Sequence, residues 1–425
     1  MKKNQEFRIV PIIACLVTMF CVGIVYLWGV FQKPVIEYFK WPDASVKMIY
    51  SAMVFMFAFG IFIGGIINDK IGPKIVVMLG GILFFAGLFL TSMLSSELPE
   101  SKSWLIYITY GGIAGTGVGF AYSGSINCIQ KWLPHRRGFA TGLCVCAFGL
   151  SIVIFTPVAE YMLKAIGTQS TFRAFAMLGA VALLMSFLIK TPPSGYAARR
   201  GVKEIQEKDA YTLRESLRDP RFWFMCTGLF FLTASYFIVN PIAKTLATLK
   251  PYEGATVSIR GLTDGQATLI YSLIGVSSAA SRLILPTLSD KLGRSKSIFA
   301  MTIVMMAASI MMIFAKGFLY GVVIFLITFA YSGPSGIYPV MTGEAYGMKN
   351  AGSIFGLSFL SLGLSSFVFN MLSNVFNPEG YITGDYTLTF IVGAAVNIIP
   401  FVCLLIYDRV AKRLNTQRAA KLAAR

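Results

Sequence analysis

The stretch "GGIINDKIGPK" runs from Gly64 to Lys74, and a near-copy of it, "LPTLSDKLGRSK", runs from Leu285 to Lys296. Each copy follows a long apolar run and holds an Asp-Lys pair with a glycine close behind it. A polar stretch from Thr191 to Arg221 lies between the copies, with six apolar runs on either side. A loop repeated at the same place in two sets of six runs predicts that one unit was duplicated.

The apolar runs indicate an integral membrane protein. Hydrophobic residues make up 56% of the chain and charged residues only 13%, whereas soluble domains are about 25% charged. Hydrocarbon about 30 Å thick needs about 20 apolar residues for each helical crossing. We predict twelve transmembrane helices, near residues 8–32, 47–67, 75–96, 104–130, 139–163, 171–190, 222–248, 264–288, 297–315, 318–344, 352–376 and 385–408.

The predicted fold is an all-α membrane protein made of two six-helix bundles, which a pseudo-two-fold axis along the membrane normal relates. The bundles are expected at 1–190 and 222–425, with a cytoplasmic linker at 191–221 and a basic cytoplasmic tail at the end. Parallel repeats of this kind are typical of secondary transporters, whose substrate site lies near the bilayer midplane between the repeats.

The net charge of +18 does not indicate nucleic-acid binding, because of where the charges lie. Lysines and arginines fall mainly in the two tails and in alternate loops, as in loops that stay in the cytoplasm. We expect a multi-pass protein of the cytoplasmic (plasma) membrane with both termini cytoplasmic, in contact with the lipid bilayer and not with nucleic acid. The seven cysteines lie in apolar runs without metal-site spacing, so we expect no metal and no cofactor.

The repeated loop is interpreted as a conformational latch. Its glycines allow a tight turn, and its Asp and Lys can pair with a neighbouring helix end in one conformational state. The alternative is a solvated turn that only follows the charge pattern of cytoplasmic loops. The latch residues are Gly65, Asp69, Lys70, Gly72 and Lys74 in the first copy, and Asp290, Lys291, Gly293 and Arg294 in the second.

Arg282 is the one charge that we place inside an apolar run. A charge there costs about 2.5–3.5 kcal/mol on insertion scales, so it indicates a site for an anion. Asp264 is roughly 27 Å away along the same helix at about 1.5 Å per residue, while Glu160 and Glu344 lie near the ends of their own spans. We therefore expect a substrate carboxylate, and no permanent acidic partner, to pair with Arg282. The alternative is that Arg282 extends to the cytoplasmic interface.

The first loop resembles the signature loop of the major facilitator superfamily, although Pro73 occupies a place that is often basic. The second copy has Pro286 where that signature has glycine. Within the superfamily the chain is most similar to the oxalate/formate antiporter branch and its monocarboxylate-transporting relatives. The similar stretches are "GIVYLWGVFQKPV" (Gly23 to Val35), "AYSGSINCIQKWLPHRRG" (Ala121 to Gly138), "DPRFWFM" (Asp219 to Met225), "SRLILPTLSDKLGR" (Ser281 to Arg294) and "GIYPVMTGEAYG" (Gly336 to Gly347).

The resemblance implies the residues of a substrate site. In that branch an arginine of the eighth span binds the substrate carboxylate, and Arg282 occupies the matching place. The other implied positions are aromatic or polar, with ordinary helix packing as the alternative for each tyrosine; they are Tyr26, Trp28, Tyr122, Asn127 and Tyr331. Among them, Tyr26 and Tyr122 are the expected hydroxyl donors.

The eleventh span departs from the oxalate-handling members, which carry a second cationic ligand there. Leu362 stands near the place of their lysine. One cation suits one carboxylate, because a second negative charge in a low-dielectric site lacks a partner. The sequence therefore favours a monocarboxylate such as lactate, pyruvate or formate.

Several points stay open at this stage. Transport by alternating access is expected either as exchange of anions or as symport with protons, by a protein that functions as a monomer. The alternative functions are oxalate/formate-type dicarboxylate exchange, export of amphipathic compounds, and a non-transporting membrane receptor. An enzyme is not expected, because the sequence shows no intramembrane nucleophile or metal cluster.

Overall fold

The computed structural model describes residues 9–193, 195–202, 209–249, 258–376 and 387–423, apart from some side chains, among them those of Tyr26 and Asp264. Every regular element within these residues is helical, because long apolar sequences satisfy their main-chain hydrogen bonds internally. An all-helical chain was predicted, and this is what the described residues show.

The helices before residue 190 match the first six predicted runs. They are α1 (Ile9–Val22), η1 (Gly23–Leu27), α2 (Trp28–Phe39), α3 (Asp43–Ile71), α4 (Pro73–Thr91), η2 (Glu100–Lys102), α5 (Trp104–Ile106), η3 (Tyr107–Ala114), α6 (Gly115–Trp132), η4 (Pro134–Arg136) and α7 (Arg137–Ser186). The fifth and sixth runs both lie in α7. Gly167 separates them, because its φ of 78° and ψ of 174° are not helical.

After residue 190, two short helices lie in the predicted linker, and the others match the remaining runs. In chain order, the helices are α8 (Tyr196–Arg199), α9 (Leu213–Arg218), α10 (Pro220–Thr248), α11 (Asp264–Leu292), α12 (Arg294–Phe314), α13 (Gly317–Ser332), α14 (Pro334–Tyr346), α15 (Ala351–Phe376), α17 (Thr387–Val396) and α18 (Ile398–Ala423). The tenth run is divided into α13 and α14 at Pro334, which has no N–H to continue the ladder. The twelfth run is divided at Asn397.

By length and apolar composition, eight of the described helices can cross a membrane, or nine if the bent pair Ile9–Val25 and Trp28–Phe39 counts as one span. One of these eight is the stretch Pro134–Ser186, which holds two predicted crossings. α11 is not among these eight, and the side chains of several of its residues, Asp264 among them, lie outside the described residues. The predicted twelve crossings therefore stay a prediction.

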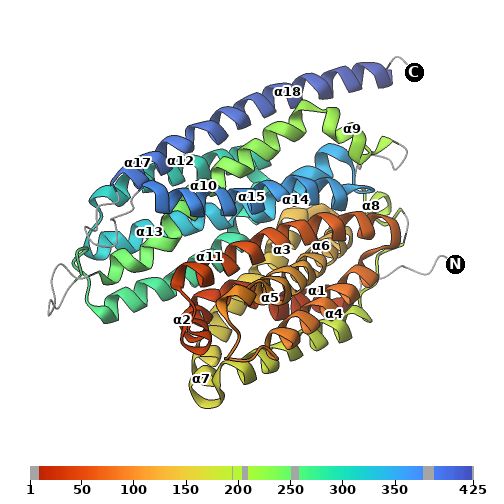
Figure 1. The fold of residues 1–425 in the computed structure, drawn as a ribbon. Helices are drawn as coiled ribbons and strands as arrows, with labels where there is room; N and C mark the ends of the chain where they lie inside the picture. Colours follow the sequence, from red (N-terminus) through yellow and green to blue (C-terminus); the bar gives the residue numbers. More distant parts are fainter. Residues whose placement is uncertain (1–8, 194, 203–208, 250–257, 377–386, 424–425) are drawn as a thin grey trace.

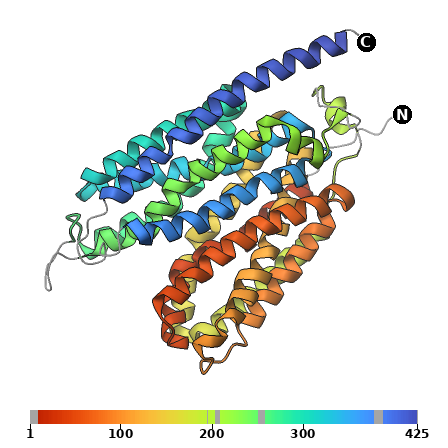
Figure 2. The ribbon, with the colours of Figure 1, turned by 45° about the horizontal axis from the view of Figure 1, so that its top comes forward.

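The helices form two groups that lie side by side. Figure 1 shows α1 to α7 on one side of the molecule and α10 to α18 on the other, and Figure 2 shows the same division after rotation. We call them the first and second groups. α8 and α9 lie at the end of the molecule where α1 begins and α18 ends (Figure 1). We call this the basic end, because the helix ends there carry Lys70, Lys74, Arg136, Lys291 and Arg294.

Two pairs of helices make most of the contact between the groups, α3 with α15 and α7 with α11, and α14 also contacts α7. Near the basic end both pairs approach closely at a glycine. Gly65 of α3 faces the carbonyl oxygen of Gly352 in α15, and Gly138 of α7 faces that of Pro286 in α11. A side chain at either glycine would overlap that oxygen, so the two helices of each pair can approach this closely only because glycine has no Cβ.

Candidate functional site: a cavity between the two groups

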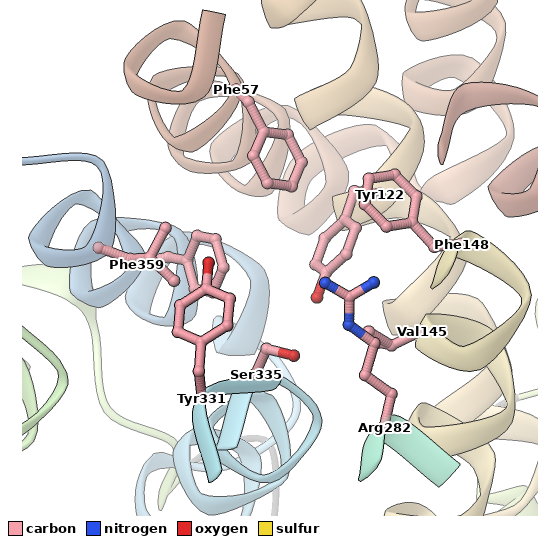
Figure 3. Close-up of a pocket in the computed structure, with 9 residues that line it drawn as sticks. Phe57, Tyr122, Val145, Phe148, Arg282, Tyr331, Ser335 and Phe359 are labelled. Atoms are coloured by element: carbon pink, nitrogen blue, oxygen red, sulfur yellow. The ribbon is translucent and has the colours of Figure 1, made fainter. Parts of the chain in front are cut away.

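A small cavity lies where the two groups meet (Figure 3). Helices α3, α6 and α7 of the first group line one side, and α11, α13, α14 and α15 of the second group line the other. Its volume is about 10 Å³, about the minimum that holds one water molecule. The residues that line it are Phe57, Tyr122, Val145, Phe148, Arg282, Tyr331, Ser335, Phe359 and Leu362.

The Arg282 guanidinium is the charged group of this cavity. Its residue is only 4% exposed, and Figure 3 shows the guanidinium directed from α11 toward Tyr122 and Phe148 of the first group. Its central carbon lies 5.8 Å from the centre of the Phe148 ring, within the range of cation–π attraction. Gly149 leaves room for it, because a Cβ at that residue would lie 3.0 Å from Nη1 of Arg282.

Aromatic rings form the wall on the side of the first group. The Tyr122 ring packs edge-on against Phe57 and Phe148, with centroid distances of 5.3 and 5.5 Å. Phe359 of α15 closes the wall from the second group, 6.1 Å from the Tyr122 ring. Edge-to-face pairs at these distances fix the ring orientations, so the Tyr122 ring is held in place beside the guanidinium (Figure 3).

Tyr331 supplies a second hydroxyl, from the end of α13. Its ring stacks face to face on Tyr236 of α10, with centroids 3.7 Å apart and planes inclined by 4°. Phe237 contacts the same ring from the side at 5.6 Å. Packing on two sides fixes this tyrosine at the cavity wall.

Ser335 supplies a third hydroxyl, at the junction of α13 and α14. The Ser335 hydroxyl donates a hydrogen bond to the carbonyl oxygen of Ser332 at 2.5 Å. The junction is irregular, because the N–H of Gly336 donates to Gly333 O at 3.0 Å and not to Ser332 O as in a regular helix. Pro334 at the start of α14 causes this local change of pattern.

The cavity therefore combines one cation, three hydroxyls and apolar rings. Among the described residues that line it, none is acidic. A guanidinium presents its donors in a planar fork that matches both oxygens of a carboxylate. Such a lining is suited to holding a small organic anion by its carboxylate, with the rest of the molecule against aromatic and aliphatic side chains.

The structure brings some of the predicted site residues together and separates others. Arg282, Tyr122 and Tyr331 line the cavity. Trp28 is 2% exposed and packs 4.8 Å from the Tyr110 ring, among residues that do not line it. Asn127 donates a hydrogen bond to Ser123 O at 3.0 Å on its own helix. The side chain of Tyr26 lies outside the described residues.

Other lining residues were not predicted as site residues. Phe57, Val145, Phe148, Ser335 and Phe359 carry no charge, and no motif of the sequence pointed to them. Leu362, identified from the missing lysine of oxalate-handling relatives, does line the cavity. A cation at that position would therefore lie beside the same space as Arg282.

The repeated loop makes the same contact in both copies, at the basic end. The Asp69 carboxylate accepts hydrogen bonds from the N–H groups of Gly352 and Ser353 at 3.1 and 2.7 Å. The Asp290 carboxylate accepts from those of Gly138 and Phe139, both at 3.0 Å. Each aspartate thus caps the first turn of a helix in the other group, where N–H groups lack helical partners and favour negative charge.

The glycines of the repeated loop form the turns that follow these aspartates, and the basic residues of the loop are ion-paired or exposed. Gly72 and Gly293 have φ values of 87° and 96°, which glycine adopts without strain. Arg294 pairs with Asp290 at 2.6 Å and with Glu344 at 2.8 Å. The remaining latch residues, Lys70, Lys74 and Lys291, are exposed to solvent.

Comparison with known proteins agrees with this geometry. The family model of the Major Facilitator Superfamily matches residues 13–370. The uncharacterized MFS-type transporter YhjX of Escherichia coli (strain K12) is 26% identical over 373 residues, which cover 85% of this chain and 86% of that protein. The oxalate:formate antiporter of Oxalobacter formigenes is 26% identical over 357 residues, 83% of this chain and 80% of that protein.

A shorter similarity extends to a third protein. Monocarboxylate transporter 13 of Bos taurus is 30% identical over 142 residues, 33% of this chain and 32% of that protein. Among solved structures, the transporter FucP in its outward conformation superposes with a TM-score of 0.68 at 14% identity, covering 94% of this chain and 99% of that one. The proton:xylose symporter XylE superposes with a TM-score of 0.69, also at 14% identity, covering 96% of each chain.

At these identities the solved structures show the fold alone, and the family match covers most of the chain. The predicted family resemblance is confirmed. The chain belongs to the major facilitator superfamily, a family of multi-pass membrane proteins that are secondary transporters and not enzymes.

Proposed function

We propose that this transporter carries small monocarboxylates, such as lactate, pyruvate or formate, with Arg282 as the anion anchor. The observation that carries the proposal is the buried guanidinium at a hydroxyl-bearing cavity between the two groups. A carboxylate there receives two parallel charge-assisted hydrogen bonds from one arginine. Similarity to an oxalate:formate antiporter and to a monocarboxylate transporter supports an organic anion as the cargo.

Leu362 favours a monocarboxylate over a dicarboxylate. It lines the cavity together with Arg282, so a second carboxylate would meet an aliphatic side chain and not a second cation. An unpaired charge in such surroundings is strongly disfavoured. Because of the similarity to the oxalate:formate antiporter, dicarboxylate exchange is the second candidate function. Counterflow with oxalate separates the two candidates.

The mechanism that we propose is alternating access by two six-helix bundles, 1–190 and 222–425, joined by the linker 191–221. We infer from the charge pattern that the basic end and both termini lie in the cytoplasm, and that the chain crosses the membrane twelve times. In this conformation the contacts of Asp69 and Asp290 close the cytoplasmic side. The cavity holds about one water molecule, so a carboxylate enters only after the bundles separate on the outer side.

The Arg282 guanidinium then gives up its present contacts and binds the substrate carboxylate. When the cytoplasmic side opens, Asp69 and Asp290 release the helix ends that they cap. Neither latch aspartate lines the cavity that holds Arg282, so binding and gating involve different residues. After the substrate is released to the cytoplasm, the transporter either binds an anion that it carries back or releases a proton that travelled with the substrate.

Counterflow in proteoliposomes tests the proposal. Vesicles that contain the purified monomeric protein are loaded with unlabelled lactate, formate or oxalate, and the entry of the labelled anion is followed. We expect lactate and formate to be exchanged and oxalate to be poorly exchanged. Absence of uptake for every carboxylate contradicts the proposal, and strong oxalate exchange selects the second candidate. Stimulation by an inward proton gradient in unloaded vesicles identifies symport, whereas dependence on internal anion identifies exchange.

A further inference from the structure

Ser335 indicates which monocarboxylates the proposed function, on which this inference rests, would prefer. The hydroxyl of Ser335 can only accept further hydrogen bonds. It lines the cavity with Arg282 (Figure 3), and its proton is already donated to Ser332 O at 2.5 Å. A hydroxyl has one donor hydrogen and two acceptor lone pairs. A serine whose hydrogen is engaged in this way presents acceptor sites to the cavity.

The engaged hydrogen is not readily released. In a regular helix the N–H of Gly336 would donate to Ser332 O, but it donates to Gly333 O at 3.0 Å. The Ser335 hydroxyl therefore takes the place of the missing main-chain donor. Turning that hydrogen toward a ligand would leave the buried Ser332 carbonyl without this hydrogen bond, which is energetically unfavourable.

We propose that Ser335 makes the transporter selective for 2-hydroxy monocarboxylates over the matching 2-oxo acids. Arg282 and Ser335, two of the three polar side chains that the second group presents here, have opposite character. Arg282 only donates hydrogen bonds, and Ser335 accepts them. A 2-hydroxy acid has an accepting carboxylate and, on the adjacent carbon, a donating hydroxyl. A 2-oxo acid has acceptors at both places, so its oxo oxygen faces the lone pairs of Ser335.

The size of the preference follows from one contact. The hydroxyl of a 2-hydroxy acid donates a hydrogen bond to Ser335, whereas a 2-oxo acid places two acceptors in contact there. Such a difference is worth about tenfold in affinity, the size of one net hydrogen bond. Simple alkanoates lack both groups, so their binding reports the carboxylate contact and the apolar wall only.

The test compares lactate, pyruvate and propionate, which share a three-carbon chain and one carboxylate. Each anion, with the two lactate enantiomers taken separately, competes against labelled lactate counterflow in proteoliposomes with the wild-type protein. We expect one lactate enantiomer to compete about tenfold better than pyruvate. Equal competition by lactate and pyruvate overturns the inference but leaves the proposed function intact. Failure of all three anions to compete overturns the proposed function itself.

Two variants separate selectivity from folding. Ser335→Ala is expected to bring the lactate-to-pyruvate preference close to one while propionate competes as before. Ser332→Ala removes a neighbouring hydroxyl that pairs with Ser278 at 2.9 Å and is expected to keep the preference. An equal loss for all three anions in Ser335→Ala would mean a structural role and would refute the selectivity. The same holds if Ser332→Ala, and not Ser335→Ala, abolishes the preference.

Discussion

Replacing Asp69 by asparagine is expected to open the basic end of the transporter. The Asp69 carboxylate receives two hydrogen bonds, 3.1 and 2.7 Å long, at the start of α15. An amide has one acceptor oxygen and an NH2 group that cannot accept, so one of the two charge-assisted hydrogen bonds is lost, at a cost of about 1.5–3 kcal/mol. The lost attraction to the helix N-terminus adds about 0.3–1 kcal/mol.

A loss of at least about 1.8 kcal/mol changes a conformational equilibrium about 20-fold or more. If the inward-open state is about 1% populated in the wild type, it should rise to about 17% or more in Asp69→Asn. Spin labels at Arg136 and Lys349, both exposed and on opposite groups at this end, report the change as a second, longer distance. The native cysteines give little background, since six of the seven are buried.

Glu97→Gln serves as the matched control, because it removes the same charge from an exposed residue between α4 and η2. Its distance distribution should equal that of the wild type. The reasoning is refuted if Asp69→Asn leaves the distribution unchanged, or if Glu97→Gln shifts it by the same amount.

Two further predictions concern the cavity. Leu362→Lys places a second cation beside Arg282 and should shift counterflow toward oxalate relative to lactate by about tenfold or more. Leu362→Met is the control and should leave the preference unchanged. A lysine variant that still prefers monoanions would count against the one-cation argument. Gly149→Ala adds a methyl 3.0 Å from Nη1 of Arg282, so the guanidinium must shift, and the KM for lactate should rise about tenfold. Gly265→Ala, with no neighbouring atom within 4 Å, is the control, and an unchanged KM in Gly149→Ala would show that the contact is unimportant.

Much of the scaffold could be predicted because its signals are strong and local. Apolar length and the positions of polar loops place most helix ends to within a few residues. The exceptions are Gly167, where two runs join, and the ends of α2 and α18, which reach Phe39 and Ala423 beyond the predicted bounds of 32 and 408. The repeated loop indicated a duplicated unit, and both copies make the same kind of contact in the structure. A charge within an apolar run is rare, which is why Arg282 was identified from sequence.

The partners of these residues could not be predicted, since they depend on which helices lie side by side. The contact of Asp69 with Ser353 joins residues 284 positions apart, and no sequence period connects them. Phe57, Phe148 and Phe359 are three of 35 phenylalanines, and nothing local distinguishes a ring at a cavity from one that faces lipid. Asn127 was assigned to the site by its polarity, but polarity does not tell which neighbour a helix face meets.

The Ser335 hydroxyl shows a further limit. Its proximity to Pro334 is visible in the sequence, but the direction of its hydrogen bond follows from the irregular junction, where Gly336 bonds Gly333 O. Only the three-dimensional arrangement shows that this serine and Arg282 border the same space.

The central claim is that the Arg282 guanidinium binds the carboxylate of the cargo, and direct binding tests it most simply. Lactate is titrated by calorimetry into the purified wild-type protein and into Arg282→Gln, after the helical content of the variant is shown to match. Loss of two charge-assisted hydrogen bonds should weaken binding by about 100-fold or more. Lactate binding of equal strength in a folded Arg282→Gln protein would contradict the account.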